Sequence, residues 1–241
     1  MSGGSQKLRW VIGQHSCMEA VKANSQWVKD IHVQEDRQRE NAAFIALCEK
    51  EKLKVRPKGR KFFVNLGEGH QGVAVSLTGR PTWGDEKAEK DTSLVVFLDG
   101  ITDPHNLGAI LRTAWLLEAD GIFIPKDRRV DLTPVVCKVA SGGAEHVSVE
   151  SCHFQTQLQW FKDQGYWVYG LGEKGAIPLP KQDLSGKVAL VVGAEGKGLR
   201  SSTEKFCDQL LSIPQVAGGS SYNASVAFSI SAYEWARKRF L

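Results

Sequence analysis

Residues 211–227 read Leu-Ser-Ile-Pro-Gln-Val-Ala-Gly-Gly-Ser-Ser-Tyr-Asn-Ala-Ser-Val-Ala, and the organisation of the chain can be worked out from them. The apolar start predicts a strand that stops at Pro214, and small and polar residues over 217–221 predict a loop. Asn223 and Ser225 can then cap a helix predicted over 224–240. Such a loop between a strand end and a helix N-terminus is a common place for a small ligand, although a plain capped turn would have the same pattern.

Apolar runs and helical periods alternate regularly upstream of this stretch, from Ser93 onward. The pattern predicts a parallel sheet covered by helices on both faces, with ligands bound at the carboxyl ends of the strands. The predicted strands are 94–98, 121–124, 166–171, 188–192 and 209–213, and the predicted helices are 107–119, 134–140, 154–164 and 202–207.

The first 80 residues predict a separate, small α/β domain. Its expected helices are 21–29 and 41–51, and its expected strands are 31–33, 53–55 and 72–77. Residues 81–92 are polar and have no apolar period, so we interpret them as a linker to a second domain over 93–241.

Composition sets the class of protein only broadly. The chain has 241 residues, a formal net charge of +4 and 42% apolar residues, which permits a nucleic-acid partner without requiring one. There is no apolar run of spanning length and no signal-peptide pattern, so we expect a cytoplasmic protein without a membrane partner. The histidines lack metal-ligand spacing, and the odd, scattered cysteines argue against disulfides and zinc. These cysteines are Cys17, Cys48, Cys137, Cys152 and Cys207.

Three polar stretches follow predicted strands and should meet at one edge of the sheet. The first runs from Asp103 to Ala114, the second is Gly193-Ala-Glu-Gly-Lys-Gly198, and the third is 211–227. The second matches neither a dinucleotide fingerprint nor a P-loop, so alone it predicts a tight turn with a carboxylate at its tip. A lone arginine such as Arg112 is usually a surface ion pair of little energetic value.

Together the three stretches resemble the SpoU, or TrmH-like, family of the SPOUT superfamily of RNA ribose 2′-O-methyltransferases. The resemblance is closest to the branch that methylates a guanosine of 23S rRNA. Gly13-Gln-His15 and His70-Gln-Gly72 resemble, more loosely, the L30e-like RNA-binding domain that precedes the catalytic domain in that branch. The matching positions are Asn106, Gly108, Arg112 and Ala114; Gly193, Glu195, Gly196 and Gly198; and Ile213, Pro214, Ser221, Asn223, Ser225 and Ala227.

This resemblance implies a trefoil-knotted α/β domain, a homodimer whose site is completed across the interface, and S-adenosylmethionine as methyl donor. The donor-binding positions it implies are Gly193, Ile213 and Tyr222, with Leu171 and Gly172 as neighbours. The chain departs from the branch at Tyr222, where leucine is usual, which puts the shape of the donor pocket in question. No metal is implied.

The expected reaction is attack of a ribose 2′-hydroxyl on a methyl sulfonium. Family accounts give Arg112 a base-like role, but a guanidinium is essentially always protonated. We therefore expect Arg112 to anchor a phosphate and stabilise the developing alkoxide, while a phosphate oxygen or water takes the proton. The remaining catalytic candidates would orient Arg112 and the ribose through hydrogen bonds, and they are Asn106, Glu195, Asn223 and Ser225.

Three other functions stay open at this point: a tRNA ribose methyltransferase, a resistance-type rRNA adenosine methyltransferase, and an RNA-binding or assembly module without catalysis. The basic run over 52–61, followed by Phe62 and Phe63, predicts RNA binding by the first domain, although a solvated loop would have a similar composition. The wide spread of apolar residues on the C-terminal helix predicts a homodimer.

Overall fold

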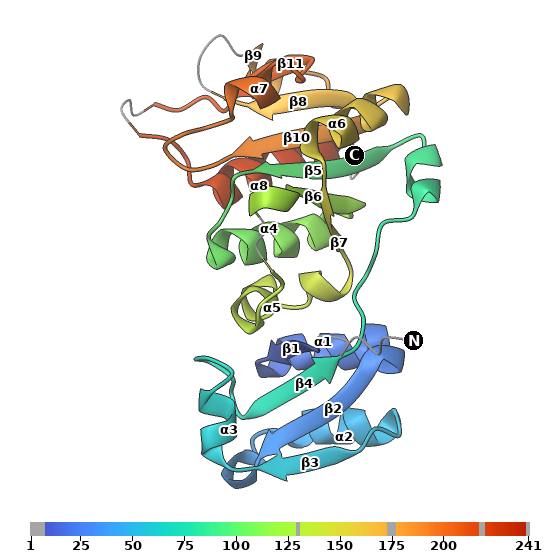
Figure 1. The fold of residues 1–241 in the computed structure, drawn as a ribbon, viewed down its shortest axis with the longest axis vertical. Helices are drawn as coiled ribbons and strands as arrows, with labels where there is room; N and C mark the ends of the chain where they lie inside the picture. The colour runs from blue at the N-terminus through green and yellow to red at the C-terminus, as the bar shows by residue number, and fades with distance from the viewer. Residues whose placement is uncertain (1–7, 129–130, 173–176, 217–219, 240–241) are drawn as a thin grey trace. The chain divides into compact units, whose positions relative to one another are not determined.

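The computed structural model describes residues 8–128, 131–172, 177–216 and 220–239 (Figure 1). The predicted loop over 217–221 lies partly outside these residues. The chain forms two compact units, which we call unit 1 (1–81 and 131–146) and unit 2 (82–130 and 147–241). Each unit has its own sheet.

Unit 2 is built on a parallel sheet, as the alternating pattern predicted. Within the described residues its strand order is β7-β6-β5-β10-β8-β11-β9, and every neighbouring pair is parallel. The neighbouring strands β5 and β10, in the middle of the sheet, are the most apolar runs. A strand that is covered on both faces buries the side chains of both faces, so it is apolar along its whole length. The strands are β5 (Ser93–Asp99), β6 (Gly121–Pro125), β7 (Ser148–Cys152), β8 (Trp167–Leu171), β9 (Ile177–Pro178), β10 (Lys187–Gly193) and β11 (Gln209–Ser212).

Helices cover both faces of this sheet. In Figure 1, α6 (Phe154–Asp163) lies in front of the sheet and α8 (Ala224–Ala236) behind it, where α8 packs against β10 and α4 (Pro104–Leu116). Two further short helices are α7 (Ser201–Glu204) and the 3₁₀ turn η3 (Asp85–Glu89). The remaining 3₁₀ turns of unit 2 are η4 (Lys126–Arg128), η6 (Leu179–Lys181) and η7 (Arg237–Arg239).

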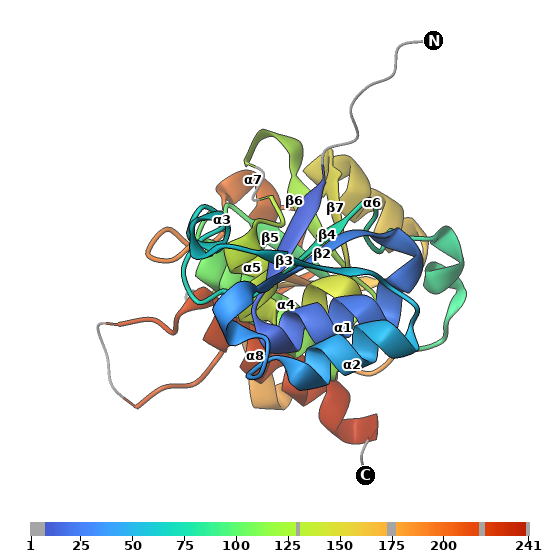
Figure 2. The same ribbon diagram turned by 90° about the horizontal axis from the view of Figure 1, so that it is seen from below.

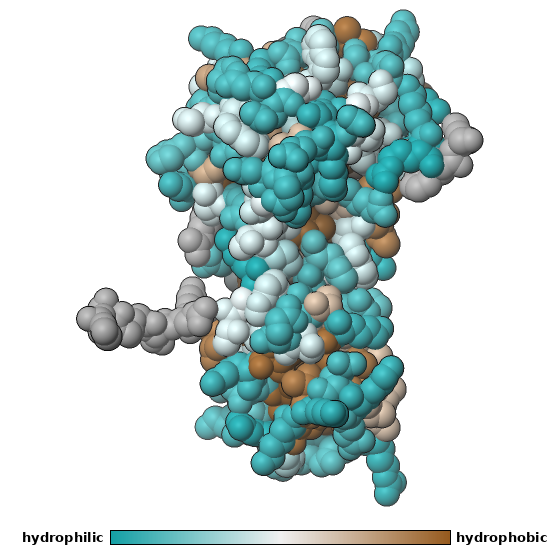
Figure 3. Space-filling view, turned by 90° about the vertical axis from the view of Figure 1, so that its right-hand side faces the viewer, coloured by the Kyte–Doolittle hydropathy of each residue, from teal (hydrophilic) through white to brown (hydrophobic). Residues whose placement is uncertain are grey.

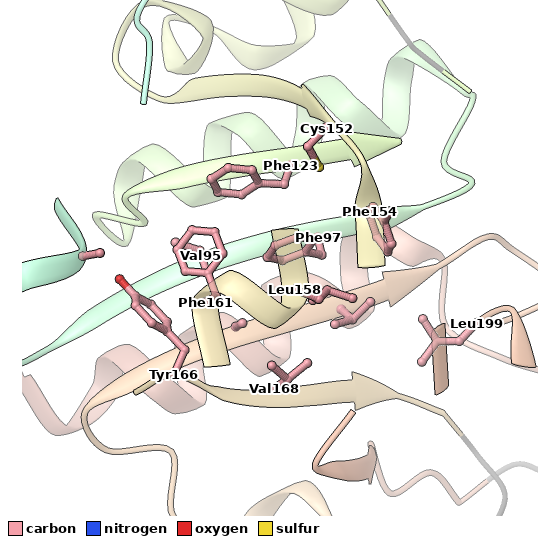
Figure 4. Packing of buried hydrophobic residues seen from close by; sticks show 13 residues of the cluster. Val95, Phe97, Phe123, Cys152, Phe154, Leu158, Phe161, Tyr166, Val168 and Leu199 are labelled. Carbon is pink, nitrogen blue, oxygen red and sulfur yellow. The ribbon is translucent and has the colours of Figure 1, made fainter. Parts of the chain in front are cut away.

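The core beneath α6 is largely aromatic (Figure 4). The rings of Phe97 and Phe123 stack with centroids 5.0 Å apart, and Phe161 of α6 packs edge-on against Phe123 at 4.9 Å. Trp83 reaches the same cluster, 5.3 Å from Phe123, so residues 82–92 are ordered on unit 2. Burial of such rings is worth roughly 1.5–3 kcal/mol each, which fixes α6 on this face.

Local capping explains where the helices of unit 2 begin. Asp103 accepts a hydrogen bond from the backbone N of His105 at 3.0 Å, and Pro104 occupies the first helical position. The first helix of unit 2 therefore starts three residues before the predicted Leu107, and Arg112 falls in its third turn. The last helix starts at Ala224 as predicted, behind the cap Asn223, but its α-helical part ends at Ala236.

Unit 1 has a mixed sheet of order β1-β4-β2-β3, in which only β2 and β3 are parallel. Figure 2 shows α1 and α2 side by side along one face of this sheet. The elements are β1 (Arg9–Ile12), α1 (Gln14–Asn24), η1 (Ser25–Trp27), β2 (Val28–Gln34), η2 (Glu35–Arg37), α2 (Ala42–Lys50), β3 (Val55–Lys58), α3 (Arg60–Val64) and β4 (Val73–Leu77).

The helix predicted over 21–29 is wrong in its position. The structure places the helix earlier, at Gln14–Asn24, because Gly13 takes a φ of 87° that ends β1 and allows α1 to start. Residues 28–34 then form β2, so the predicted helix wrongly included the first two residues of this strand. The strand predicted over 53–55 is shifted to Val55–Lys58, where an edge position tolerates Pro57.

Residues 131–146 lie between β6 and β7 in sequence but belong to unit 1. They carry α5 (Pro134–Ala140) and η5 (Gly143–Glu145). Arg9 donates two hydrogen bonds to the buried carboxylate of Glu145, at 2.7 and 2.6 Å, and Asn24 donates to the Glu145 carbonyl at 3.0 Å. Ser16 Oγ donates to the carbonyl of Cys137 at 3.1 Å. Unit 1 is thus assembled from two distant parts of the chain.

The face drawn in Figure 3 differs in polarity between the two units. Hydrophilic side chains predominate on unit 2, whereas unit 1 has a patch of hydrophobic side chains.

Among the described residues, no helix is both long enough and apolar enough to cross a membrane.

Candidate functional site

A cavity of about 670 Å³ opens at the carboxyl edge of the unit 2 sheet, towards which the arrowheads of β8 and β10 point in Figure 1. It is lined by the ends of β8, β10 and β11 and by the loops that follow β10 and β11. All five residues predicted to bind the donor line it, and they are Leu171, Gly172, Gly193, Ile213 and Tyr222. This volume is typical of a small-molecule site.

The loop after β10 depends on close backbone packing at Gly193. A Cβ on Gly193 would collide with the carbonyl group of Gly198 and lie 2.5 Å from the backbone N of Leu199. The loop closes through a hydrogen bond from Gly198 N to Ala194 O at 2.8 Å, and Gly196 and Gly198 have positive φ values of 70° and 65°. The glycines therefore set the shape of this wall of the cavity.

Asp99 and Arg200 hold the same loop in place, and the sequence analysis did not identify them. Asp99 ends β5 with its side chain fully buried, and it accepts hydrogen bonds from Nε of Arg200 at 2.5 Å and from its backbone N at 3.0 Å. The guanidinium also lies over the ring of Phe154 at 5.7 Å. The signal available in the sequence was an aspartate directly after the apolar run 94–98, and the structure buries this whole strand.

Three predicted catalytic side chains form a closed hydrogen-bonded network beside the cavity. Asn106 in the first turn of α4 donates to Oε1 of Glu195 at 3.0 Å and accepts from Nδ2 of Asn223 at 2.9 Å. Asn223 also donates to Glu195. Since the three residues follow β5, β10 and β11, the network joins the ends of three strands.

Ser225 joins this network through the cap of α8. Its backbone N and its hydroxyl both donate to Oδ1 of Asn223, at 2.9 and 2.6 Å. The amide of Asn223 is thereby oriented, because its oxygen faces the helix and its nitrogen faces Glu195. One turn later Ser229 is hydrogen-bonded to Thr113 of α4 at 3.0 Å, which ties the two helices together.

Arg112 does not join the network within this single chain. It lies on α4 with an exposed side chain, and among the described residues no hydrogen bond or ion pair reaches it. Tyr222 is 41% exposed at the mouth of the cavity.

The cavity suits an adenosine-containing donor better than a metal or a covalent nucleophile. Its walls combine glycine backbone with aliphatic side chains such as Leu211 and Ile213, and they include two side chains of opposite charge, Glu204 and Lys197. Among the described residues, no group of three or more His, Cys, Asp or Glu is placed to hold a metal ion. Burial raises the pKa of the nearby Cys207 thiol to about 12, so it is not a thiolate at neutral pH.

Fold and site together define an α/β protein with a small-molecule pocket and a polar network at the carboxyl edge of a parallel sheet. Residues 93–233 match the model of the SpoU rRNA Methylase family. The chain therefore belongs to the SpoU rRNA methylase family.

Relatives match along nearly the whole chain. It is 34% identical to proteins from Pseudomonas putida and Coxiella burnetii, each named 23S rRNA (guanosine-2′-O-)-methyltransferase RlmB, over 97% of this chain and 98% and 97% of theirs. It is 32% identical to a putative TrmH family tRNA/rRNA methyltransferase from Staphylococcus saprophyticus, over 95% of both chains.

Solved structures share the fold at lower identity. The SpoU methyltransferase AviRb from Streptomyces viridochromogenes, in complex with AdoMet, has a TM-score of 0.79 and 21% identity over 96% of this chain and 90% of its own. An AdoMet-bound rRNA methyltransferase from Sinorhizobium meliloti has a TM-score of 0.79 and 22% identity, over 97% of this chain and 88% of its own.

Proposed function

We propose that this protein transfers a methyl group from S-adenosylmethionine to a ribose 2′-hydroxyl, at a guanosine of 23S rRNA. The observation that carries the proposal is the cavity lined by every residue predicted to bind the donor, next to the Asn106–Glu195–Asn223 network. The guanosine and 23S rRNA assignments are supported by the names of the full-length relatives.

S-adenosylmethionine, when bound, supplies an electrophilic methyl group on a sulfonium sulfur. Gly193, Ile213 and Tyr222 would hold it, with Leu171 and Gly172 beside them. Arg112 would bind an RNA phosphate through its planar guanidinium, which can donate to two oxygens at once, and would stabilise the developing 2′-alkoxide. The 2′-hydroxyl proton would pass to a phosphate oxygen or to water, because the guanidinium has no free acceptor.

The catalytic unit would be a homodimer with sites completed across the interface. This explains why Arg112 is exposed and apart from the network in one chain. Exposed apolar side chains on the two neighbouring helices also favour a partner, since Leu116 of α4 is 64% exposed and Tyr233 of α8 is 57% exposed. We further propose that the loops at the sheet edge form the trefoil knot of the family and that unit 1 is its L30e-like domain.

Unit 1 would select the RNA. The basic run over 52–61 lies on β3, α3 and the turns beside them, with its Lys and Arg side chains exposed. Phe63 is fully buried, so it supports the fold of unit 1, whereas Phe62 is half-buried beneath Lys58, whose Nζ lies 5.9 Å from the ring centre. The run therefore offers charge rather than exposed rings.

An Arg112→Lys variant tests the catalytic assignment. Lysine keeps the charge but loses the two-pronged geometry, so single-turnover methylation of unmodified 23S rRNA should fall about a hundred- to thousandfold. Calorimetric affinity for S-adenosylmethionine should not change, and the control Arg237→Lys should methylate at the parental rate. A loss below about threefold, far short of the expected effect, would remove Arg112 from the site.

Mixing two inactive variants tests the shared site. Arg112→Ala and Glu195→Ala chains, exchanged at random, would give mixed dimers with one intact site, restoring about a quarter of the parental sites. No recovery would contradict a site shared between two chains, and a monomer in sedimentation at micromolar concentration would contradict the homodimer.

Ribose-methylation mapping of rRNA and tRNA from a deletion strain identifies the target. Loss of a 23S guanosine mark supports the proposal. Loss of a tRNA or adenosine mark would favour the alternative methyltransferases. No loss, together with no calorimetric binding of S-adenosylmethionine, would favour the module without catalysis.

A further inference from the structure

A glycine-rich loop in unit 1, Gly67–Gly72, connects α3 to β4 and is surrounded by positive charge. Gly67, Gly69 and Gly72 have φ values of 115°, 71° and 77°, and Gln71 also has a positive φ of 53°. His70 lies in this loop, and Arg37, Arg60 and Lys138 lie close enough to act on its charge. We call these four residues the Lys138 cluster.

Two members of the cluster, Lys138 and Arg37, lie in close contact with glycines of the loop. A Cβ on Gly69 would collide with Nζ of Lys138 and lie 2.6 Å from its Cε, so the ammonium group rests on the glycine. A Cβ on Gly72 would lie 2.9 Å from Cδ of Arg37. Glycine at these positions therefore makes room for two cationic side chains as well as for the turn.

The hydrogen bond and the pKa of His70 describe its surroundings in the cluster. Its Nδ1 accepts a hydrogen bond from Gly72 N at 2.9 Å, which leaves Nε2 with the proton of the neutral ring. Burial comes first, and then the three cations of the cluster, in lowering the pKa of His70. Cations are the only charged groups among these causes, and no carboxylate is among them.

Little negative charge offsets these cations. Glu40 lies 3.8 Å from Arg37, and both side chains are well exposed, so that pair is weak. Within the described part of the chain, neither Arg60 nor Lys138 has an ion-pair partner, and both side chains are exposed. The exposed Glu68 is the one carboxylate of the loop itself.

Lys138 is held in the cluster by the rest of α5. Ser16 donates to the carbonyl of the preceding residue, Cys137, and the Arg9–Glu145 pair fixes the end of the same segment. Lys138 thus comes from the stretch between β6 and β7, within the 93–233 family match, although it belongs to unit 1. These buried contacts fix the position of the backbone that carries Lys138.

We infer that the Lys138 cluster is a phosphate-binding site for the RNA backbone, in which Arg37, Arg60 and Lys138 supply charge and neutral His70 donates from Nε2. The inference rests on the proposed function, because it assumes an RNA substrate. It adds a site separate from most of the basic run over 52–61, sharing only Arg60. It also means that the two stretches of chain that build unit 1 both contact the substrate.

The test uses full-length protein and unmodified 23S rRNA transcribed in vitro, with affinity measured across a series of salt concentrations. Lys138→Gln removes one phosphate contact, so binding should weaken and the slope of log affinity against log salt should fall by about 0.7–0.9. The matched control is Lys29→Gln, an exposed lysine near the start of β2, at the opposite end of that strand from Arg37. It should leave both the affinity and the slope unchanged.

Failure of this inference and of the proposed function can be told apart. If the parent binds 23S rRNA and Lys138→Gln behaves like Lys29→Gln, the cluster is not a phosphate site and the methyltransferase assignment stands. If the parent binds no 23S rRNA, the proposed substrate is wrong and the inference falls with it. Calorimetric binding of S-adenosylmethionine by both variants should match the parent, which excludes a folding defect in unit 2.

Discussion

The loop after β10 in unit 2 and the loop before β4 in unit 1 are both rich in glycine, but different atoms occupy the space beside their glycines. Backbone atoms of Gly198 and Leu199 pack against Gly193, whereas the side chain of Lys138 packs against Gly69. The first loop is further held by a buried carboxylate, Asp99. The second depends on a segment from elsewhere in the chain.

This difference indicates how each loop meets a ligand. The backbone next to Gly193 cannot move aside without disturbing the strand it continues, so a substitution there should abolish donor binding. A side chain can be exchanged while the backbone stays in place, so each substitution in the Lys138 cluster should lower RNA affinity by a limited amount. Rigid positioning suits a reacting methyl group, and adjustable charge suits a phosphate chain.

Arg9→Met should have the largest effect, and it would break the support of the unit 1 loop. It leaves the buried carboxylate of Glu145 without its partner, which typically costs about 3–5 kcal/mol. Urea unfolding should show this loss of stability, and 23S rRNA affinity should fall because the segment carrying Lys138 is released.

The control for this prediction is Lys238→Met, which removes an exposed pair with Asp183 and should change stability by less than about 0.5 kcal/mol. Equal stability of Arg9→Met and the parent would mean that the buried pair does not hold residues 131–146 on unit 1.

Gly193→Ala tests the rigid loop and should have an intermediate effect. The added methyl group meets backbone on the opposite strand of the turn, so we expect about 1–3 kcal/mol of destabilisation and loss of calorimetric binding of S-adenosylmethionine. Gly59→Ala is the matched control, because its Cβ would meet nothing within 4 Å and it does not line the cavity. Parental donor affinity in Gly193→Ala would contradict the rigid-loop interpretation.

His70→Asn should have the smallest effect and sharpens the description of the unit 1 loop. The folded protein holds the pKa of His70 below its usual value, so this stabilisation is complete above about pH 6.5 and is lost as the pH falls through the folded-state pKa. Asparagine can still accept from Gly72 N but does not titrate. The free energy of unfolding should therefore fall less steeply on acidification in the variant, and identical slopes would contradict the lowered pKa of His70 in the folded protein.

The sequence predicted the elements that have a continuous apolar run or a clear helix start. Both β5 and β10 are continuous apolar runs, and α5 starts at Pro134 behind the cap Thr133, so their limits were close to those observed. Short elements without a clear apolar pattern were missed. The strand β7 reads Ser-Val-Glu-Ser-Cys at the sheet edge, and β1 is only four residues long, so neither has enough period to be distinguished from a loop.

The residues of the candidate site could be predicted where they belong to the family motifs. The contacts that hold these residues in place depend on tertiary packing and could not be predicted. The five donor positions line one cavity, and Asn106, Glu195 and Asn223 meet as the strand order requires. The anchoring of Arg200 to Asp99 depends on two residues about a hundred positions apart, which no local pattern reveals.

The assignment of residues 131–146 to unit 1 has a consequence for synthesis of the chain. The ribosome releases the first 81 residues well before α5, so the nascent unit 1 must wait for β5 and β6 to emerge before it can be completed. At roughly 5–20 residues per second, that interval lasts on the order of several seconds. During it, Arg9 and Asn24 lack Glu145, and the surface that will receive Val136 and Ala140 is open to chaperones or to other nascent chains.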